Sequence, residues 1–144
     1  MPENPKRIHL IGEPGRYEEA IAAVALIPGQ LGKLNADGAL IAHDVAGGPA
    51  ESIFTLEDAL QGKTIDNPAV VGETTPYIIA SKGDVIYAFL EAGQSVTPAD
   101  YLASAGNGNL QEASGSNARL AVPLESLDLS DSDAEDTRIR VRIL

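Results

Sequence analysis

The sequence contains no cysteine and no tryptophan, and only four Tyr and two Phe among its 144 residues. Without cysteine the chain has no disulfide, no thiolate nucleophile and no Cys-ligated zinc. Because aromatic residues are so few, the core must be built mostly from Ala, Val, Ile and Leu. With 44% apolar residues, a chain of this length forms one packed domain that buries roughly two-thirds of its unfolded surface.

Long apolar runs are also lacking. The longest, residues 20–27, is far shorter than the ~20 residues that a membrane-spanning helix needs. The first residues, Met-Pro-Glu-Asn-Pro-Lys-Arg, have none of the apolar character of a secretory leader. We therefore expect a soluble intracellular product.

Basic residues are scarce as well, with Lys+Arg 10 against Asp+Glu 21 and a net charge of −11. A protein binds a nucleic acid backbone by neutralising its phosphates with Lys and Arg, so this balance argues against a nucleic acid partner. It argues equally against an anionic membrane surface.

Glycine and proline, by contrast, are abundant and spread along the chain, with 14 Gly and 9 Pro. This punctuation favours many short strands joined by turns. Extended segments are expected at residues 6–11, 18–27, 30–34, 39–45, 77–80, 84–90, 101–103 and 120–127. Three turn signals predict hairpins, at 35–38, at 81–83 and at Asn107-Gly108.

The C-terminal residues 138–143 alternate strictly between arginine and an apolar residue. Period-two alternation predicts a strand with Ile139, Val141 and Ile143 facing the core and the arginines on the other face. The preceding segment 131–136 is acidic, and we expect it to be a solvated loop that supplies the nearest partners for those arginines.

One helix is predicted, at residues 51–60, because Ile53, Leu56 and Leu60 recur at helical spacing before Gly62. From the residues alone, the expectation is one mostly β domain with a short helix.

The two histidines are the first candidates for chemistry. His43 precedes Asp44, but neighbours on a strand point to opposite faces, so a side-chain pair is not expected and a structural role is favoured. A metal site built from His9, His43 and carboxylates stays open, although no known ligand spacing is present. We expect no catalytic residue, no cofactor and no resident metal.

Two further motifs have alternative interpretations. Lys82 is the nearest candidate for the modified lysine of a biotinyl or lipoyl carrier. Such a lysine lies at the tip of a hairpin among acidic and apolar residues, and Lys82 lacks these neighbours. Gly106-Asn107-Gly108 lacks the Lys-Ser/Thr and the helix start of a phosphate-binding loop, so a hairpin turn is favoured.

Four segments, taken together, resemble the small decoration (cement) proteins that coat the capsids of tailed bacteriophages. They are Leu26-Ile27-Pro28-Gly29-Gln30-Leu31, then Gly62-Lys63-Thr64-Ile65 with Val71-Gly72-Glu73, then residues 83–90 with 102–110, and finally Arg138-Ile139-Arg140-Val141. Each is a strand and turn pattern, and their order and spacing carry the resemblance, which extends from about residue 20 to the C-terminus.

The resemblance implies a mainly β fold, a small β-barrel-like or β-tulip domain with one or two short helices. It implies a structural virion protein, made in the host bacterial cytoplasm, that binds the outer surface of the major capsid protein lattice as a homotrimer or dimer and cements the head. The expected division is an N-terminal strand or arm at 1–17 and a β-rich decoration domain at 18–144. An edge strand in the arm could pair with a capsid loop. The candidate residues for this interface are Lys6, Arg7, Ile8, His9 and Leu10.

Two other classes of protein remain as alternatives. One is a small β-barrel carrier or hydrolase domain, and the other is a tail-associated or adhesion β module.

Overall fold

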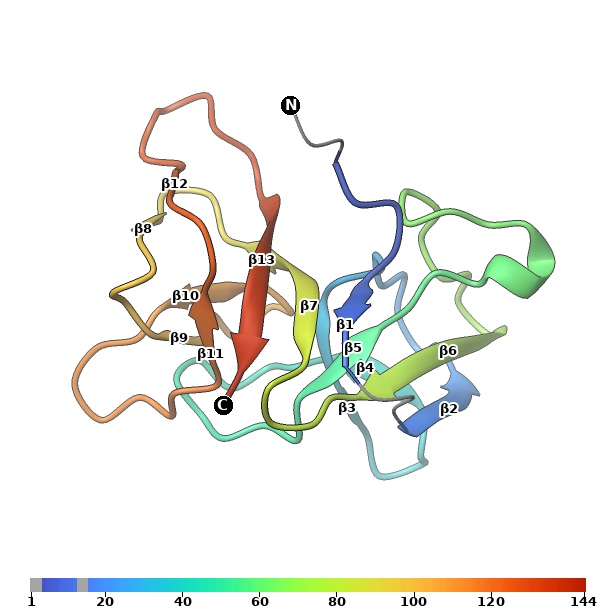
Figure 1. The fold of residues 1–144 in the computed structure, drawn as a ribbon. Coiled ribbons are helices and arrows are strands. Elements are labelled where there is room, and N and C mark those ends of the chain that lie inside the picture. The colour runs from blue at the N-terminus through green and yellow to red at the C-terminus, as the bar shows by residue number, and fades with distance from the viewer. Residues whose placement is uncertain (1–3, 13–15) are drawn as a thin grey trace.

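The computed structural model describes residues 4–12 and 16–144, which are 38% strand and 2% helix. The mainly β expectation is confirmed (Figure 1). The strands are β1 (His9–Ile11), β2 (Arg16–Ile21), β3 (Leu31–Leu34), β4 (Leu40–Ala42), β5 (Ile53–Thr55), β6 (Thr74–Ile79), β7 (Val85–Leu90), β8 (Ser95–Val96), β9 (Leu102–Ser104), β10 (Leu110–Glu112), β11 (Ala121–Pro123), β12 (Leu127–Asp128) and β13 (Thr137–Ile143). A 3-10 turn, η1, spans Ala59–Gln61.

The C-terminal half forms a closed five-stranded barrel in the order β7-β10-β9-β11-β13. Closure comes from the antiparallel pairing of β13 with β7, which runs from Thr137 opposite Leu90 to Arg142 opposite Val85. On its other edge, β7 pairs with β1 near its beginning and with β10 at Leu90. β7 is therefore the strand that joins the N-terminal segment to the barrel.

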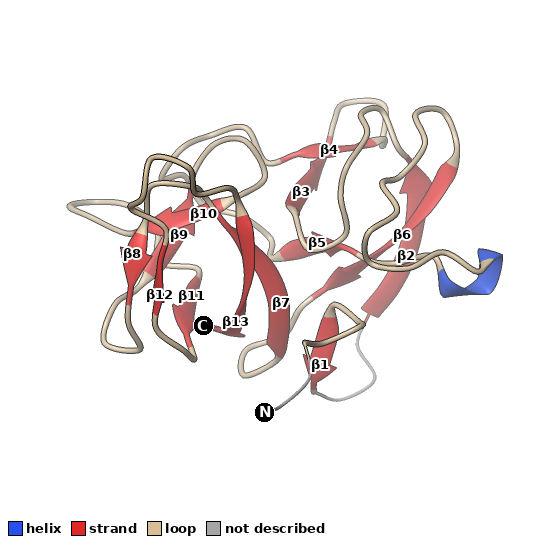
Figure 2. Cartoon of the chain, turned by 90° about the horizontal axis from the view of Figure 1, so that it is seen from above, coloured by secondary structure: helices blue, strands red, loops and turns tan. Residues whose placement is uncertain are grey.

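The N-terminal half forms a second sheet in the order β2-β6-β5-β3-β4. This sheet curls until its two outer strands meet, because Ala22, just beyond β2, bridges to Leu40 in β4. A small apolar cluster fills the curl, made of Ala22, Leu26, Leu40, Ile53, Ala69 and Tyr77. The two sheets lie side by side (Figure 2).

A single larger core joins the two sheets. Leu31, Phe54 and Ile78 of the second sheet pack in the same cluster as Ile86 and Ile139 of the barrel. All five side chains are fully buried. The two sheets therefore stabilise one another through apolar burial as well as through the contacts between their loops.

The loop before β3 makes a close backbone contact between the sheets. Gly29 accepts a hydrogen bond from the Phe89 amide of β7, and the Leu31 amide donates to Gly108 in the β9–β10 turn. Gly29 has φ +101°, and a Cβ there would lie 2.7 Å from the Tyr87 carbonyl oxygen. Only glycine allows this approach, because any side chain would force the loop off the barrel.

The helix expected at residues 51–60 is wrong. Residues 53–55 are instead strand β5, which lies between β3 and β6 and is buried at every position. A strand buried on both faces reads as a short apolar run, and such a run cannot be told from a helix by its period. Leu60 does not pack in the core at all, since its side chain is 97% exposed on the 3-10 turn.

The hairpin expected at residues 81–83 is also wrong. β6 pairs with β2 and β5, whereas β7 belongs to the barrel, so the turn carries the chain from one sheet to the other. The Asp84 carboxylate fixes this turn by accepting a hydrogen bond from the Ser81 amide at 2.9 Å. A tight turn is thus not by itself evidence that the flanking strands pair.

Two other local patterns are confirmed. The Asn107-Gly108 turn joins the antiparallel strands β9 and β10. In β13 the alternate side chains of Ile139, Val141 and Ile143 are buried, as the alternation predicts.

We expect Val141→Asp to lower the free energy of unfolding by about 3 kcal/mol or more, because it places an unpaired charge in the barrel core. Arg142→Asp, at the exposed neighbouring position, is the matched control and should leave the stability nearly unchanged. Urea denaturation of both variants measures the difference. Equal midpoints for Val141→Asp and the wild type would contradict the burial of this strand face.

Candidate functional site

The five candidate interface residues lie on the segment that leads into β1 and on the first two residues of β1, and they differ in exposure. Lys6 and Arg7 are exposed, and His9 and Leu10 are half-buried. The Ile8 side chain is fully buried in the shared core. Ile8 therefore anchors the segment, and the surface that this segment offers to a partner comes from its neighbours.

Ile8 is held by its backbone as well. Its carbonyl oxygen accepts the Tyr87 amide of β7 at 2.8 Å, and its amide donates to the Glu57 carboxylate at 3.2 Å. Glu57 lies 49 residues further along the chain, in the connection between β5 and η1. The N-terminal segment is thus fixed between the barrel and the second sheet.

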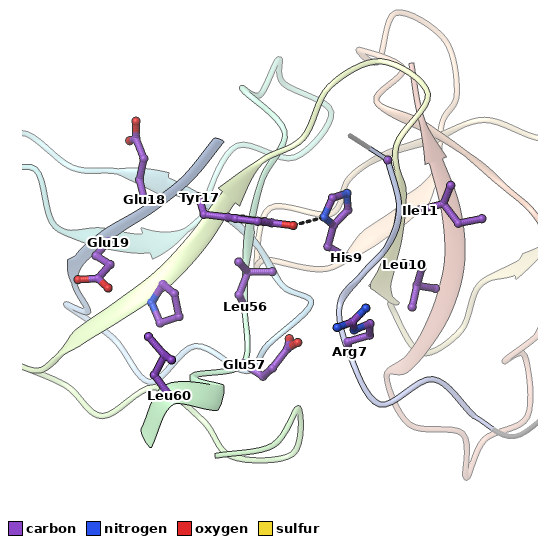
Figure 3. A pocket seen from close by; sticks show the side chains of 12 residues that line it. Arg7, His9, Leu10, Ile11, Tyr17, Glu18, Glu19, Leu56, Glu57 and Leu60 are labelled. Atoms are coloured by element: carbon purple, nitrogen blue, oxygen red, sulfur yellow. Dashed lines mark hydrogen bonds between the residues drawn. The ribbon is translucent and has the colours of Figure 1, made fainter. Parts of the chain in front are cut away.

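A hollow of about 510 Å³ lies between β1 and β2 (Figure 3). Tyr17 reaches across it from β2, and its hydroxyl hydrogen-bonds His9 Nδ1 on β1. Leu56 and Pro76 contribute apolar surface to the lining. A second hollow of about 710 Å³ adjoins the first, and both are lined by Arg7 and Glu57.

The far side of His9 faces a buried carboxylate. His9 Nε2 lies 3.8 Å from Asp84 Oδ2, which is too long for a hydrogen bond. Gly12 lies against this pair, and a Cβ at this position would be only 2.2 Å from Asp84 Oδ1. Its φ of +147° is a backbone conformation that favours glycine. Because Asp84 also fixes the β6–β7 turn, the pair ties β1 to the junction between the sheets.

The terminal arginines do not pair with the acidic segment 131–136, so that expectation is wrong. Arg138 pairs with Asp66 at 3.3 Å, and Arg140 pairs with Glu125 at 2.7 Å. The acidic segment is mostly exposed, as predicted. Its last carboxylate, Asp136, instead accepts a hydrogen bond from the Ala92 amide.

Arg138 is the most fully engaged of the basic residues. Its guanidinium donates to the carbonyl oxygens of Pro28 and Ile65 and lies 4.6 Å from the centre of the Phe89 ring. It therefore ties β13 to two loops of the second sheet at the wall of the larger hollow.

His43 is a structural residue. It is buried, its Nε2 lies 2.9 Å from the Pro49 carbonyl oxygen, and its Nδ1 lies 2.6 Å from Ser104 Oγ on β9. A carbonyl can only accept, so Nε2 donates to it and Nδ1 accepts the serine hydroxyl. The imidazole thus links the two sheets.

Asp44 points away from His43 to the surface, as expected for neighbouring residues. Its carboxylate lies 2.6 Å from Lys33 Nζ, and the hydrogen bond from that ammonium lowers the pKa of Asp44 below its usual range. The hydrolase alternative based on His43 and Asp44 therefore gains no support from their geometry.

Tyr77 is the one tyrosine whose environment changes its acidity strongly. Burial raises its pKa to about 12, and the hydrogen bond that its hydroxyl donates to Glu18 at 2.8 Å acts in the same direction. The phenol stays protonated at physiological pH and ties the outer strand β2 to β6.

The carrier interpretation of Lys82 also loses support. Lys82 lies on the turn that crosses between sheets, and not at the tip of the hairpin that a carrier domain uses.

Within residues 4–12 and 16–144, no cluster of three or more His, Asp or Glu side chains could hold a metal ion. In the same ranges no helix has the length and apolar character needed to cross a membrane.

The sequence pointed to the N-terminal segment but missed the residues that complete its surroundings. Glu57, Lys63 and Tyr17 come from elements that only the tertiary fold brings beside β1. The one available signal was the scarcity of basic residues, which made the Lys6-Arg7 pair and Lys63 notable.

No family model and no curated protein matches this sequence. Among solved structures, the chain is similar to the N base of the head fiber protein gp8.5 of bacteriophage phi29, with a TM-score of 0.56. The match covers 90% of this chain and 93% of that chain at 11% sequence identity. The likeness therefore shows a shared fold over almost the whole of both chains.

We expect His43→Ala to lower the free energy of unfolding by about 1–3 kcal/mol, because it removes the imidazole partner of the buried Ser104 hydroxyl and the donor to the Pro49 carbonyl. Asp44→Ala removes only an exposed ion pair and should shift the denaturation midpoint little. Thermal and urea unfolding of the two variants provide the comparison. If His43→Ala were as stable as the wild type, the imidazole would not be a tether between the sheets.

Proposed function

We propose that this chain is a structural protein of a bacteriophage virion that binds the capsid from outside. The observation that carries the proposal is the fold shared with the N base of a phage head fiber protein along almost the entire length of both chains. The resemblance of four sequence segments to decoration proteins supports the same class of role independently of that comparison.

In its finer form, the proposal is that the protein binds the lattice of the major capsid protein on the outer surface and stabilises the head. It would be made in the host bacterial cytoplasm and added to assembled shells. Two sheets with one core make a firm body, and the closed barrel leaves none of its own five strands with a free edge. Such a body suits a role that depends on surface complementarity.

The net charge of −11 is compatible with this location. A strongly acidic exterior keeps a protein that is displayed in many copies soluble, and it repels the packaged genome. Binding in many copies also lets each individual contact be modest.

The direct test is sedimentation with expanded shells made only of the major capsid protein. We expect the purified protein at micromolar concentration to sediment with the shells and to raise the temperature at which they dissociate. An acidic protein of similar size serves as the control for nonspecific trapping. Protein that stays in the supernatant over a range of salt concentrations would contradict the proposal, and binding to tails or cells instead would favour the tail or adhesion alternative.

We further propose that the protein acts as a homotrimer, with a homodimer as the alternative. Light scattering on the purified protein should give about three times the 15.0 kDa mass of one chain. A mass of one chain at every concentration would contradict self-association, and twice that mass would replace the trimer by the dimer.

A further inference from the structure

The two hollows beside the N-terminal segment form one groove. Both are lined by Arg7 and Glu57, so the hollow between β1 and β2 continues into the one that borders Lys63. In Figure 3, Arg7 and Glu57 lie toward one end of the first hollow, and Tyr17 and His9 lie further along it. We call this continuous surface the N-terminal groove.

One end of the N-terminal groove is basic. The chain has Lys+Arg 10, and four of these residues line the larger hollow, namely Lys6, Arg7, Lys63 and Arg138. The protein as a whole has a net charge of −11, so this group of basic side chains makes the larger hollow locally positive on a negative protein. A surface of this kind attracts negative charge from a partner.

Two acidic side chains of the larger hollow are already engaged within the protein. Glu57 accepts the Ile8 amide, and Asp66 pairs with Arg138. Among residues 4–12 and 16–144, by contrast, Lys6 and Arg7 form no ion pair, and Lys63 has only a long contact of 3.9 Å to Glu73. Positive charge therefore predominates in the larger hollow, whereas the first hollow also carries Glu18, which accepts the Tyr77 hydroxyl, and Glu19.

Exposed apolar side chains also line the first hollow. Ile11 is 66% exposed, Tyr17 53% and Leu60 97%. Leu60 stands on the 3-10 turn, and contact with apolar groups of a partner would remove this surface from water. In the described part of the chain, β1 pairs only with β7, which leaves its other edge to a partner strand.

We propose that the N-terminal groove binds an extended protein segment that carries acidic side chains toward Lys6, Arg7 and Lys63 and apolar side chains toward Ile11, Tyr17 and Leu60. This inference rests on the proposed function, and the segment belongs to the capsid protein. The overall charge of −11 favours a peptide over nucleic acid, because a long polyanion would be repelled by the rest of the surface.

The test uses the full chain and a matched pair of variants. Lys6→Glu with Arg7→Glu reverses two charges in the groove. Arg119→Glu with Arg142→Glu reverses two exposed charges that do not line it. Binding is measured to capsid protein shells, and also to a labelled peptide of alternating aspartate and valine, with a lysine and valine peptide and single-stranded DNA as the other probes.

We expect the groove variant to lose about tenfold or more in affinity for both the shells and the acidic peptide, and the control variant to bind like the wild type. Shells bound equally by both variants, with no binding of the acidic peptide, would overturn the groove while leaving the proposed function intact. Groove-dependent binding of the peptide without any binding of shells would support the groove and overturn the proposed function. Tighter groove-dependent binding of DNA than of the peptide would overturn the assignment of a protein segment.

Discussion

The close approach of the Gly29 loop to β7 is the constraint on which the rest of the structure depends. At this point the backbones of the two sheets are joined by hydrogen bonds in both directions, and the Arg138 guanidinium donates a hydrogen bond to the neighbouring Pro28 carbonyl. A side chain at position 29 would collide with the Tyr87 carbonyl. The shared core around Leu31 and Phe54 can close only because this approach is possible.

The contact between the Gly29 loop and β7 also positions the N-terminal groove. Tyr87, whose carbonyl limits position 29, donates its amide to Ile8, so the contact between the sheets and the anchoring of the N-terminal segment are adjacent on one strand. Glu57 then holds the Ile8 amide from the second sheet. Charge and shape in the groove are consequences of how the two sheets meet, and the residues that line it come from both.

Local patterns in the sequence predicted local structure well, and the relation between distant segments poorly. The alternation in β13 and the Asn107-Gly108 turn report geometry that neighbouring residues determine. The buried strand β5 and the crossing at residues 81–83 depend on which strands lie beside them, and no short window contains that information. The candidate site shows the same difference. Residues 6–10 could be named from the sequence as one segment. The burial of Ile8 and its hydrogen bond to Glu57 could not, because Glu57 is 49 residues away in the chain.

The pairing of β7 with β13 also governs the order in which the protein can fold during synthesis. The strands of the second sheet lie within residues 16–79 and can pair as soon as they leave the ribosome. The barrel begins at Val85, but its closing strand β13 spans residues 137–143, so the edges of β7 and β11 stay open until that strand has emerged. During that interval the unpaired edges of β7 and β11 are open to pairing with another chain, and the core that Leu31, Phe54 and Ile78 share with the barrel is still incomplete.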